Sequence, residues 1–365
     1  MTEIVKLKDL QGEKEKSVGR GADGGSEPGG RTPKQDEPKD RVAKYLRKLN
    51  EGTLFDELND EMLDRLGMAE VLKGVPVPVD AGEGQELTTR TIAVNMGRVL
   101  GGDPDFPFRA QYLEYIKRIF GDQAVKAMIG EGVKRSSAGN YEAGAMFFRT
   151  ALLMDPQNRD ALYYYGRALT DAYSLENDDE NYVGSFKAEA IDIFELLTMI
   201  HQDFDMGYYF LGYSYANLGL YKKAQLTWQT FLELSSSRTD KDGEDMREEI
   251  SERLESLEEP VKIEAAVNDI LRGDFQNGRD VLLGYTEGPY SQWWPLWYYL
   301  AQAETALGSA EEAIQDYKTA LRYSPSNIQI MEELIQVYEA VGLNDSAEKY
   351  RKKIEIVKDN MAAEE

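Results

Sequence analysis

The chain has 365 residues, of which 42% are hydrophobic, so it can bury a large core or a long solenoid. Its formal net charge of −24 argues against binding to nucleic acid or to an anionic membrane, because both need clustered Lys and Arg. It contains no cysteine, which excludes disulfides, thiolate metal sites and cysteine nucleophiles. The segment MTEIVKLKDLQGEKEK has no apolar signal region, and no run of about 18 apolar residues follows. We therefore expect a cytoplasmic protein.

Residues 1–40 are expected to form a disordered tail. The first ten carry a short apolar segment (Ile4, Val5, Leu7 and Leu10) that could dock onto a partner or fray. The following tract is rich in Gly, Pro, Lys, Glu and Asp and has almost nothing apolar with which to offset the entropy of ordering.

Residues 41–123 are predicted to form a helical N-terminal region that covers the exposed end of a repeat array. Helical spacing runs through Val42–Leu49, and again from Leu54 to Leu66 after a break at Gly52. Pro76 and Pro78 force residues 75–79 to be extended, and a loop follows up to Gln85. Further helices are expected at 88–100, stopping at Gly101-Gly102, and at 108–120.

One pattern recurs in the remaining chain. The stretch Gly139–Pro156 reads GNYEAGAMFFRTALLMDP, which is a turn followed by a helix and a stop at proline. It returns at residues 308–325, and a related pattern runs from Leu211 to Phe231. Small residues at fixed positions allow two helices to approach closely, while large residues fill the gaps between neighbouring units. The pattern indicates a repeated helical hairpin of about 34 residues.

These residues resemble the tetratricopeptide repeat (TPR) family over roughly residues 124–357. The resemblance implies an all-α fold, a right-handed solenoid of helical hairpins with a helical N-terminal cap and a disordered tail. We expect two blocks of three units each, at 124–259 and 260–365. The second unit carries about 12 extra residues near 170–187, and we interpret the acidic stretch 174–181 among them as a solvated loop. Residues 242–259 are expected to form an acidic helix. The fourth and sixth units are degenerate.

The resemblance also implies a concave face lined by the first helix of each unit, suited to binding a protein or peptide. The predicted binding residues at these positions are Tyr163, Arg167, Met206, Tyr209, Tyr213, Asn217, Tyr298 and Gln302. Tyrosine offers flat apolar area and a hydroxyl at little entropic cost. These side chains could instead pack on neighbouring helices. The lysines with which some family members hold a partner's terminal carboxylate are missing here.

No catalytic or metal-binding arrangement stands out. His201 is the single histidine and has no paired nucleophile, so we read it as a surface residue. The pair Trp293-Trp294 before Pro295 is expected to join the fourth unit to the fifth, with ligand stacking as the alternative. We therefore predict a non-enzymatic scaffold or adaptor without cofactor or metal. The alternative is a peptide-sensing regulator that changes conformation when it binds a short signalling peptide.

Overall fold

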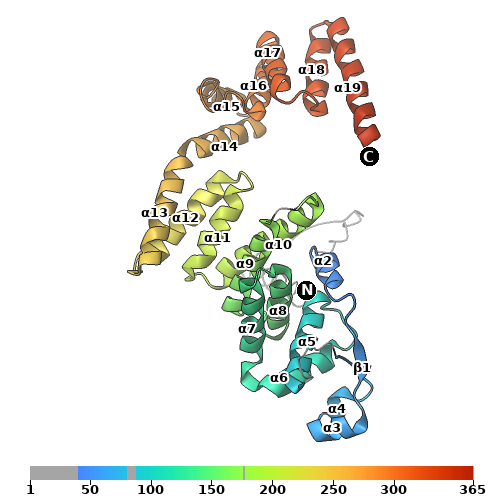
Figure 1. The fold of residues 1–365 in the computed structure, drawn as a ribbon. Coiled ribbons are helices and arrows are strands. Elements are labelled where there is room, and N and C mark those ends of the chain that lie inside the picture. The colour runs from blue at the N-terminus through green and yellow to red at the C-terminus, as the bar shows by residue number, and fades with distance from the viewer. Residues whose placement is uncertain (1–39, 80–87, 176, 365) are drawn as a thin grey trace, which may run out of the picture. The chain divides into compact units, whose positions relative to one another are not determined.

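The computed structural model describes residues 40–79, 88–175 and 177–364. The predicted disordered tail, its apolar decapeptide and most of the linker before residue 88 lie outside these described residues. The chain divides into two compact units. The N-unit comprises residues up to Leu218 together with 227–237, and the C-unit comprises 219–226 together with 238–365. Figure 1 shows both units as successions of helical hairpins.

The N-unit begins with a region of short elements and continues with paired helices. Its elements are α2 (Ala43–Lys48), β1 (Phe55–Glu57), α3 (Asp60–Leu66), α4 (Ala69–Leu72), β2 (Pro76–Pro78), α5 (Thr89–Gly102), α6 (Arg109–Phe120), the 3-10 helix η1 (Gly121–Gln123), α7 (Ala124–Ser137), α8 (Tyr141–Met154), α9 (Arg159–Tyr173), α10 (Glu180–Ile200) and α11 (Asp205–Ala216). Helix α12 (Tyr221–Ser235) contributes its later residues to this unit and its first six to the C-unit.

Over its described residues, the regular elements of the C-unit are all helices. They are α13 (Lys241–Ser256), α14 (Glu258–Leu271), α15 (Phe275–Leu283), α16 (Trp294–Leu307), α17 (Ala310–Tyr323), α18 (Ile328–Ala340) and α19 (Asn344–Glu364). Consecutive helices pack as pairs, namely α14 with α15, α16 with α17 and α18 with α19. The predicted all-α hairpin fold is confirmed. The acidic stretch after residue 240 forms α13, and the predicted division near residue 260 stays a prediction.

The pairing depends on a small residue facing a large aromatic one. A Cβ atom built on Gly212 would lie 2.2 Å from the indole nitrogen of Trp228, and one on Gly132 would lie 2.5 Å from the Phe148 ring. In both pairs the aromatic residue follows the glycine by 16 positions. In the second repeat Gly166 faces Phe194, 28 positions later, because this repeat carries the insertion.

The described residues between α9 and α10 are exposed, as predicted for the acidic stretch of the insertion, and the insertion also lengthens the helix that follows. Only a short connection precedes α10, which begins at Glu180 and runs for 21 residues. Its first turns bury Tyr182 and Phe186, whose rings lie 5.1 and 5.9 Å from the ring of Tyr45 in α2. The apolar side chains in the added turns therefore give α2 a surface on which to pack.

Two expectations for the N-terminal region are wrong. The segment predicted to be helical from Leu54 contains strand β1, which pairs antiparallel with β2 in the register Phe55 to Pro78. The helix begins only after Asn59, whose side chain caps it. The first apolar residues of this stretch therefore have helical spacing only by coincidence. Phe55 among them stacks on Phe106, with the ring centres 6.0 Å apart.

Helix α5 does not stop before Gly101-Gly102 but includes both residues. A Cβ atom on Gly101 would lie 1.9 Å from the carbonyl oxygen of Met146 in α8. The glycine therefore serves a close approach between two helix backbones rather than a turn. Beside this contact, the Thr150 hydroxyl donates a 2.6 Å hydrogen bond to the carbonyl of Gly97.

Ion pairs join the chain just before α2 to the repeats. Arg149 of α8 is 2% exposed and pairs with Asp40. Arg41 pairs with Asp192 of α10 and lies 3.9 Å from the buried carboxylate of Glu189. Burial raises the pKa of Glu189 and the positive charge of Arg149 opposes this effect. This cluster fixes the point at which the N-terminal segment meets α8 and α10.

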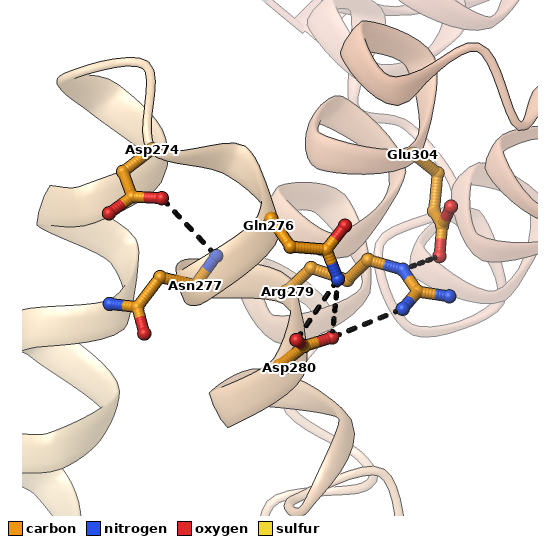
Figure 2. A network of polar contacts seen from close by, with 6 residues as sticks. All are labelled: Asp274, Gln276, Asn277, Arg279, Asp280 and Glu304. Carbon is orange, nitrogen blue, oxygen red and sulfur yellow. Dashed lines mark hydrogen bonds and ion pairs between the residues drawn. The ribbon is translucent and has the colours of Figure 1, made fainter.

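A polar network connects the fourth and fifth repeats in the C-unit (Figure 2). Arg279 of α15 donates to the carboxylate of Glu304 in α16, which is 2% exposed. The same guanidinium donates to Asp280 at 3.2 Å, and Gln276 holds Asp280 from one turn earlier at 2.9 and 3.0 Å. One arginine therefore spans two helices and provides the counter-charge for a buried glutamate.

Candidate functional site

The predicted residues Tyr163 and Arg167 lie together on α9 and are half-buried. Arg167 donates to the Tyr163 hydroxyl at 3.2 Å, and its guanidinium lies 4.6 Å from the centre of the Phe210 ring. The Tyr163 ring meets Phe204 edge-on at 5.4 Å. Both residues therefore form a cation–π cluster with the aromatic side chains of the next repeat.

Tyr209 and Tyr213 belong to α11 and pack mainly onto α12. Tyr209 meets Phe231 at 5.3 Å, and Tyr213 meets Trp228 at 5.0 Å, both edge-on. The backbone carbonyl of Tyr209 also accepts a 3.1 Å hydrogen bond from the Trp228 indole. Each tyrosine thus makes the kind of contact with a neighbouring helix that the alternative predicted, and both side chains are half-buried.

The other two predicted residues of the N-unit lie at the ends of α11. Met206 is half-buried in its first turn, where its backbone N–H donates to Asp205. Asn217 is exposed and caps the end of the helix. Its carbonyl accepts a 3.1 Å hydrogen bond from the Lys187 ammonium.

The C-unit contains a cavity of about 800 Å³, built by the first helices of three successive repeats. Helices α14, α16 and α18 supply most of its wall, and the start of α12 completes it. Its aromatic lining residues are Tyr221, Tyr290, Trp293, Trp294, Tyr298 and Tyr299, and its polar ones are Glu264, Gln302, Gln329 and Glu333. Of the predicted site residues, Tyr298 and Gln302 line this cavity.

The local sequence explains how α16 presents these rings. Pro295 lies in the first turn of α16, where its missing N–H costs no hydrogen bond. Trp294 starts the helix and packs edge-on against Tyr298 one turn later, at 6.0 Å. Trp293 lies just outside the helix and is 40% exposed. The tryptophan pair therefore both packs on the repeats and lines the cavity.

A carboxylate held by three side chains lies at this cavity. Glu333 of α18 accepts hydrogen bonds from the hydroxyls of Tyr298 at 2.6 Å and Tyr317 at 2.8 Å. The Gln302 amide donates to both of its oxygens, at 3.3 and 3.1 Å. Burial, and then the hydrogen bond to Glu333, raise the pKa of the Tyr298 and Tyr317 hydroxyls, so both remain protonated donors.

Sequence reasoning missed Glu333 and its neighbour Gln329, which donates to the Tyr298 hydroxyl at 2.6 Å. Both are on α18, in a repeat whose pattern is degenerate. Their spacing could have indicated them. Gln329 and Glu333 are four residues apart on one helix, so they lie on one face, the same face as the concave positions assigned in the other repeats.

A second cavity of about 990 Å³ shares part of the same wall. Leu271, Gln302 and Glu333 line both cavities, and Arg272 and Phe275 belong to the second. Glu333 therefore lies where two adjoining hollows of the C-unit meet.

The described residues contain no group of three or more His, Asp or Glu side chains placed to hold a metal ion. His201 caps the end of α10, and its Nε2 lies 2.7 Å from the carbonyl of Gln157. Over the described part of the chain, no helix is long and apolar enough to cross a membrane.

Helical hairpins that repeat with a small residue facing a large aromatic one define this chain as a helical repeat protein. Residues 295–327 match the family model of the tetratricopeptide repeat. The matched residues include α17 and all of α16 except its first residue. The predicted resemblance to TPR proteins is thus confirmed, and the matched segment coincides with the fifth predicted unit. Among curated proteins none matches the chain.

Solved structures of TPR proteins are similar to this chain at low identity and with low TM-scores. The P58(IPK) TPR domain is 18% identical, covering 63% of this chain and 59% of that chain, with a TM-score of 0.37. TTC0263, a TPR protein of Thermus thermophilus, is 13% identical, covering 68% and 98%, with a TM-score of 0.30. MamA from Desulfovibrio magneticus RS-1 is 12% identical, covering 66% and 98%, with a TM-score of 0.27.

Proposed function

We propose that the chain is a non-enzymatic scaffold that binds a protein partner through an extended peptide segment, and that the cavity of the C-unit is its main binding site. The observation that carries this proposal is the cavity lined by α14, α16 and α18. Its size falls within the range of ligand sites, and its wall combines several aromatic rings with a few oriented polar groups. Aromatic rings of this kind dominate the binding energy of protein interfaces.

The exposed face of Trp293 supports a role in binding. This side chain lines the cavity and is 40% exposed. Trp297, in the first turn of α16, instead donates its indole N–H to the carbonyl of Ser291 at 2.7 Å and packs against the core. Trp293 is therefore the ring that can lose its water to a ligand without repacking the repeats.

The predicted residues of the N-unit remain candidates for a second contact surface. Tyr163 and Arg167 keep exposed parts, and Asn217 is exposed at its helix end. Much of Tyr209 and Tyr213 is engaged on α12. We therefore place the main site in the C-unit and treat the N-unit residues as an additional surface.

The test is selection of short random peptides from a phage-displayed library on the full chain, followed by titration of the recovered peptides. Trp293→Ala should weaken their binding by about tenfold or more, as expected for a central aromatic anchor. Tyr323→Ala is the matched control, because Tyr323 is 38% exposed but does not line the cavity. The proposal is overturned if no peptide is enriched, or if both variants bind the recovered peptides as the wild type does.

The same titrations separate a static scaffold from a peptide-sensing regulator. A scaffold binds with little change in the scattering radius of the chain. A clear change in that radius on adding the peptide would support the regulator instead.

A further inference from the structure

The ionisable groups of the C-unit cavity have one sign of charge. Apart from tyrosines, its lining residues that ionise are Glu264 and Glu333, and no lysine or arginine is among them. One oxygen of Glu264 accepts a 2.7 Å hydrogen bond from the backbone N–H of Lys222 at the start of α12. A neutral peptide N–H leaves the negative charge of that carboxylate in place.

Glu333 is held firmly but is not neutralised. Its hydrogen-bond partners within the described residues are two tyrosine hydroxyls and one glutamine amide, all of them uncharged donors. These bonds orient the carboxylate and join α16, α17 and α18 around it. An anion fixed by neutral dipoles beside a cavity presents its charge to whatever enters.

The wall around this charge suits a cation. Trp293, Trp294, Tyr298 and Tyr299 line the same cavity. The faces of such rings attract ammonium and guanidinium groups, and the attraction grows as the site loses water. The formal charge of −24 on the whole chain adds a long-range attraction for basic segments.

The hydrogen bonds at Glu333 also show where a cation fits. The two tyrosine bonds are short, at 2.6 and 2.8 Å, whereas the Gln302 amide spreads over both oxygens at 3.1 and 3.3 Å. A carboxylate has about four lone-pair positions, so an incoming donor must displace the weakest bonds. A group that replaces the Gln302 amide would meet both oxygens of Glu333.

We propose that the C-unit cavity binds a lysine or arginine side chain of an extended peptide, with Glu333 as the counter-charge and the surrounding Trp and Tyr rings packed along the stem. The cation takes the place of the Gln302 amide at the carboxylate. Because Glu333 also lines the second cavity, the peptide on either side of the basic residue has room in both hollows. This inference rests on the proposed function, since it names the chemistry of that peptide.

The first arm of the test uses the wild-type chain and the peptides recovered from the display library. They should carry a Lys or Arg at one shared position. Replacing a lysine there by norleucine keeps the aliphatic stem and removes the charge, and should weaken binding by about tenfold or more. This arm needs no variant of the protein, so it does not depend on the folding of any mutant.

The second arm removes the charge from the protein. Glu333→Gln should weaken binding of the lysine peptide by about tenfold and leave the norleucine peptide within about twofold. Glu332→Gln is the matched control, because Glu332 is the exposed neighbour on α18 and does not line the cavity. Circular dichroism and thermal melting check that both variants are folded.

The outcomes separate this inference from the proposed function. Peptides that need Trp293 but show no preference for Lys or Arg would overturn the cation site and leave peptide binding intact. Equal affinity of the lysine and norleucine peptides, or unchanged binding in Glu333→Gln, would overturn it as well. If no peptide is enriched at all, the proposed function fails, and this inference fails with it.

Discussion

The carboxyl group of Asp316 should make the stability of the C-unit depend on pH. Asp316 is half-buried on α17, close to Glu304 and Arg279 of the network between the fourth and fifth repeats. Burial, and then the negative charge of Glu304, raise its pKa from an ordinary 3.8 to about 7. Arg279 opposes this shift, and the charge of Glu312 adds to it.

The direction of this pH dependence follows from which state, folded or unfolded, binds the proton of Asp316 more tightly. Because the pKa is higher in the folded chain, the folded state binds more protons than the unfolded state between pH 3.8 and about 7. The free energy of unfolding therefore falls as the pH rises through this window, and the full cost of the buried charge is present above it. The difference in pKa corresponds to at most about 4 kcal/mol. Since Asp316 keeps partial contact with water, we expect about 1 to 2 kcal/mol after screening.

The test is Asp316→Asn, which keeps the shape of the side chain and removes the charge. Urea unfolding can be followed by tryptophan fluorescence, because three of the four tryptophans (Trp293, Trp294 and Trp297) lie in the C-unit. The variant should have a higher free energy of unfolding than the wild type, and this difference should be about 1 kcal/mol larger at a pH near 8.5 than at a pH near 5. Asp359→Asn, at an exposed position of α19, is the control and should show no such difference. An equal gain at both pH values, or a loss at the higher one, would refute the reasoning.

Three further substitutions test the packing of the N-unit by thermal or urea unfolding. Gly212→Ala places a Cβ atom 2.2 Å from the Trp228 indole and should cost about 1 to 3 kcal/mol, so a neutral effect would contradict the close packing. Gly184→Ala makes the same change at an exposed helical position with nothing within 4 Å, and should instead stabilise by about 0.5 to 1 kcal/mol. Arg149→Met leaves the carboxylate of Asp40 without its buried partner and should cost about 3 to 5 kcal/mol. A loss below about 1 kcal/mol would show that the pair contributes little to folding.

The repeat fold could be predicted because it depends on contacts close in sequence. A glycine and an aromatic residue 16 positions later, as in Gly212 and Trp228, lie within one hairpin, where the glycine allows the two helices to approach closely. The N-terminal region could not be predicted in this way, because its structure depends on contacts between residues far apart in the sequence. Gly101 reads as a helix stop until Met146 of α8 is known to lie against it, and Phe55 reads as helical until β2 pairs with its backbone.

The residues of the candidate site likewise differ in whether they could be predicted from the sequence. Tyr298 and Gln302 lie on a well-preserved repeat, so their positions on the first helix could be assigned from the sequence alone. Glu333 could not, because its importance arises from hydroxyls supplied by two other helices. The sequence also could not show that Tyr298 would be 6% exposed, with its hydroxyl committed to a neighbouring carboxylate.

The position of Gln302 connects the binding site to the packing of the repeats. Its amide donates to the Tyr298 hydroxyl at 2.8 Å and to both oxygens of Glu333, so it links α16 to α18. A cation that displaces this amide removes a neutral link between the two helices and supplies a charged one in its place. Charge-assisted hydrogen bonds are about twice as strong as neutral ones. Because the charge of the bound side chain would meet Glu333 of α18 while its stem packs on the rings of α16, that side chain should bridge the two helices in place of the amide. Ligand binding and the stability of the fifth and sixth repeats would then rise together, because both draw on the same carboxylate.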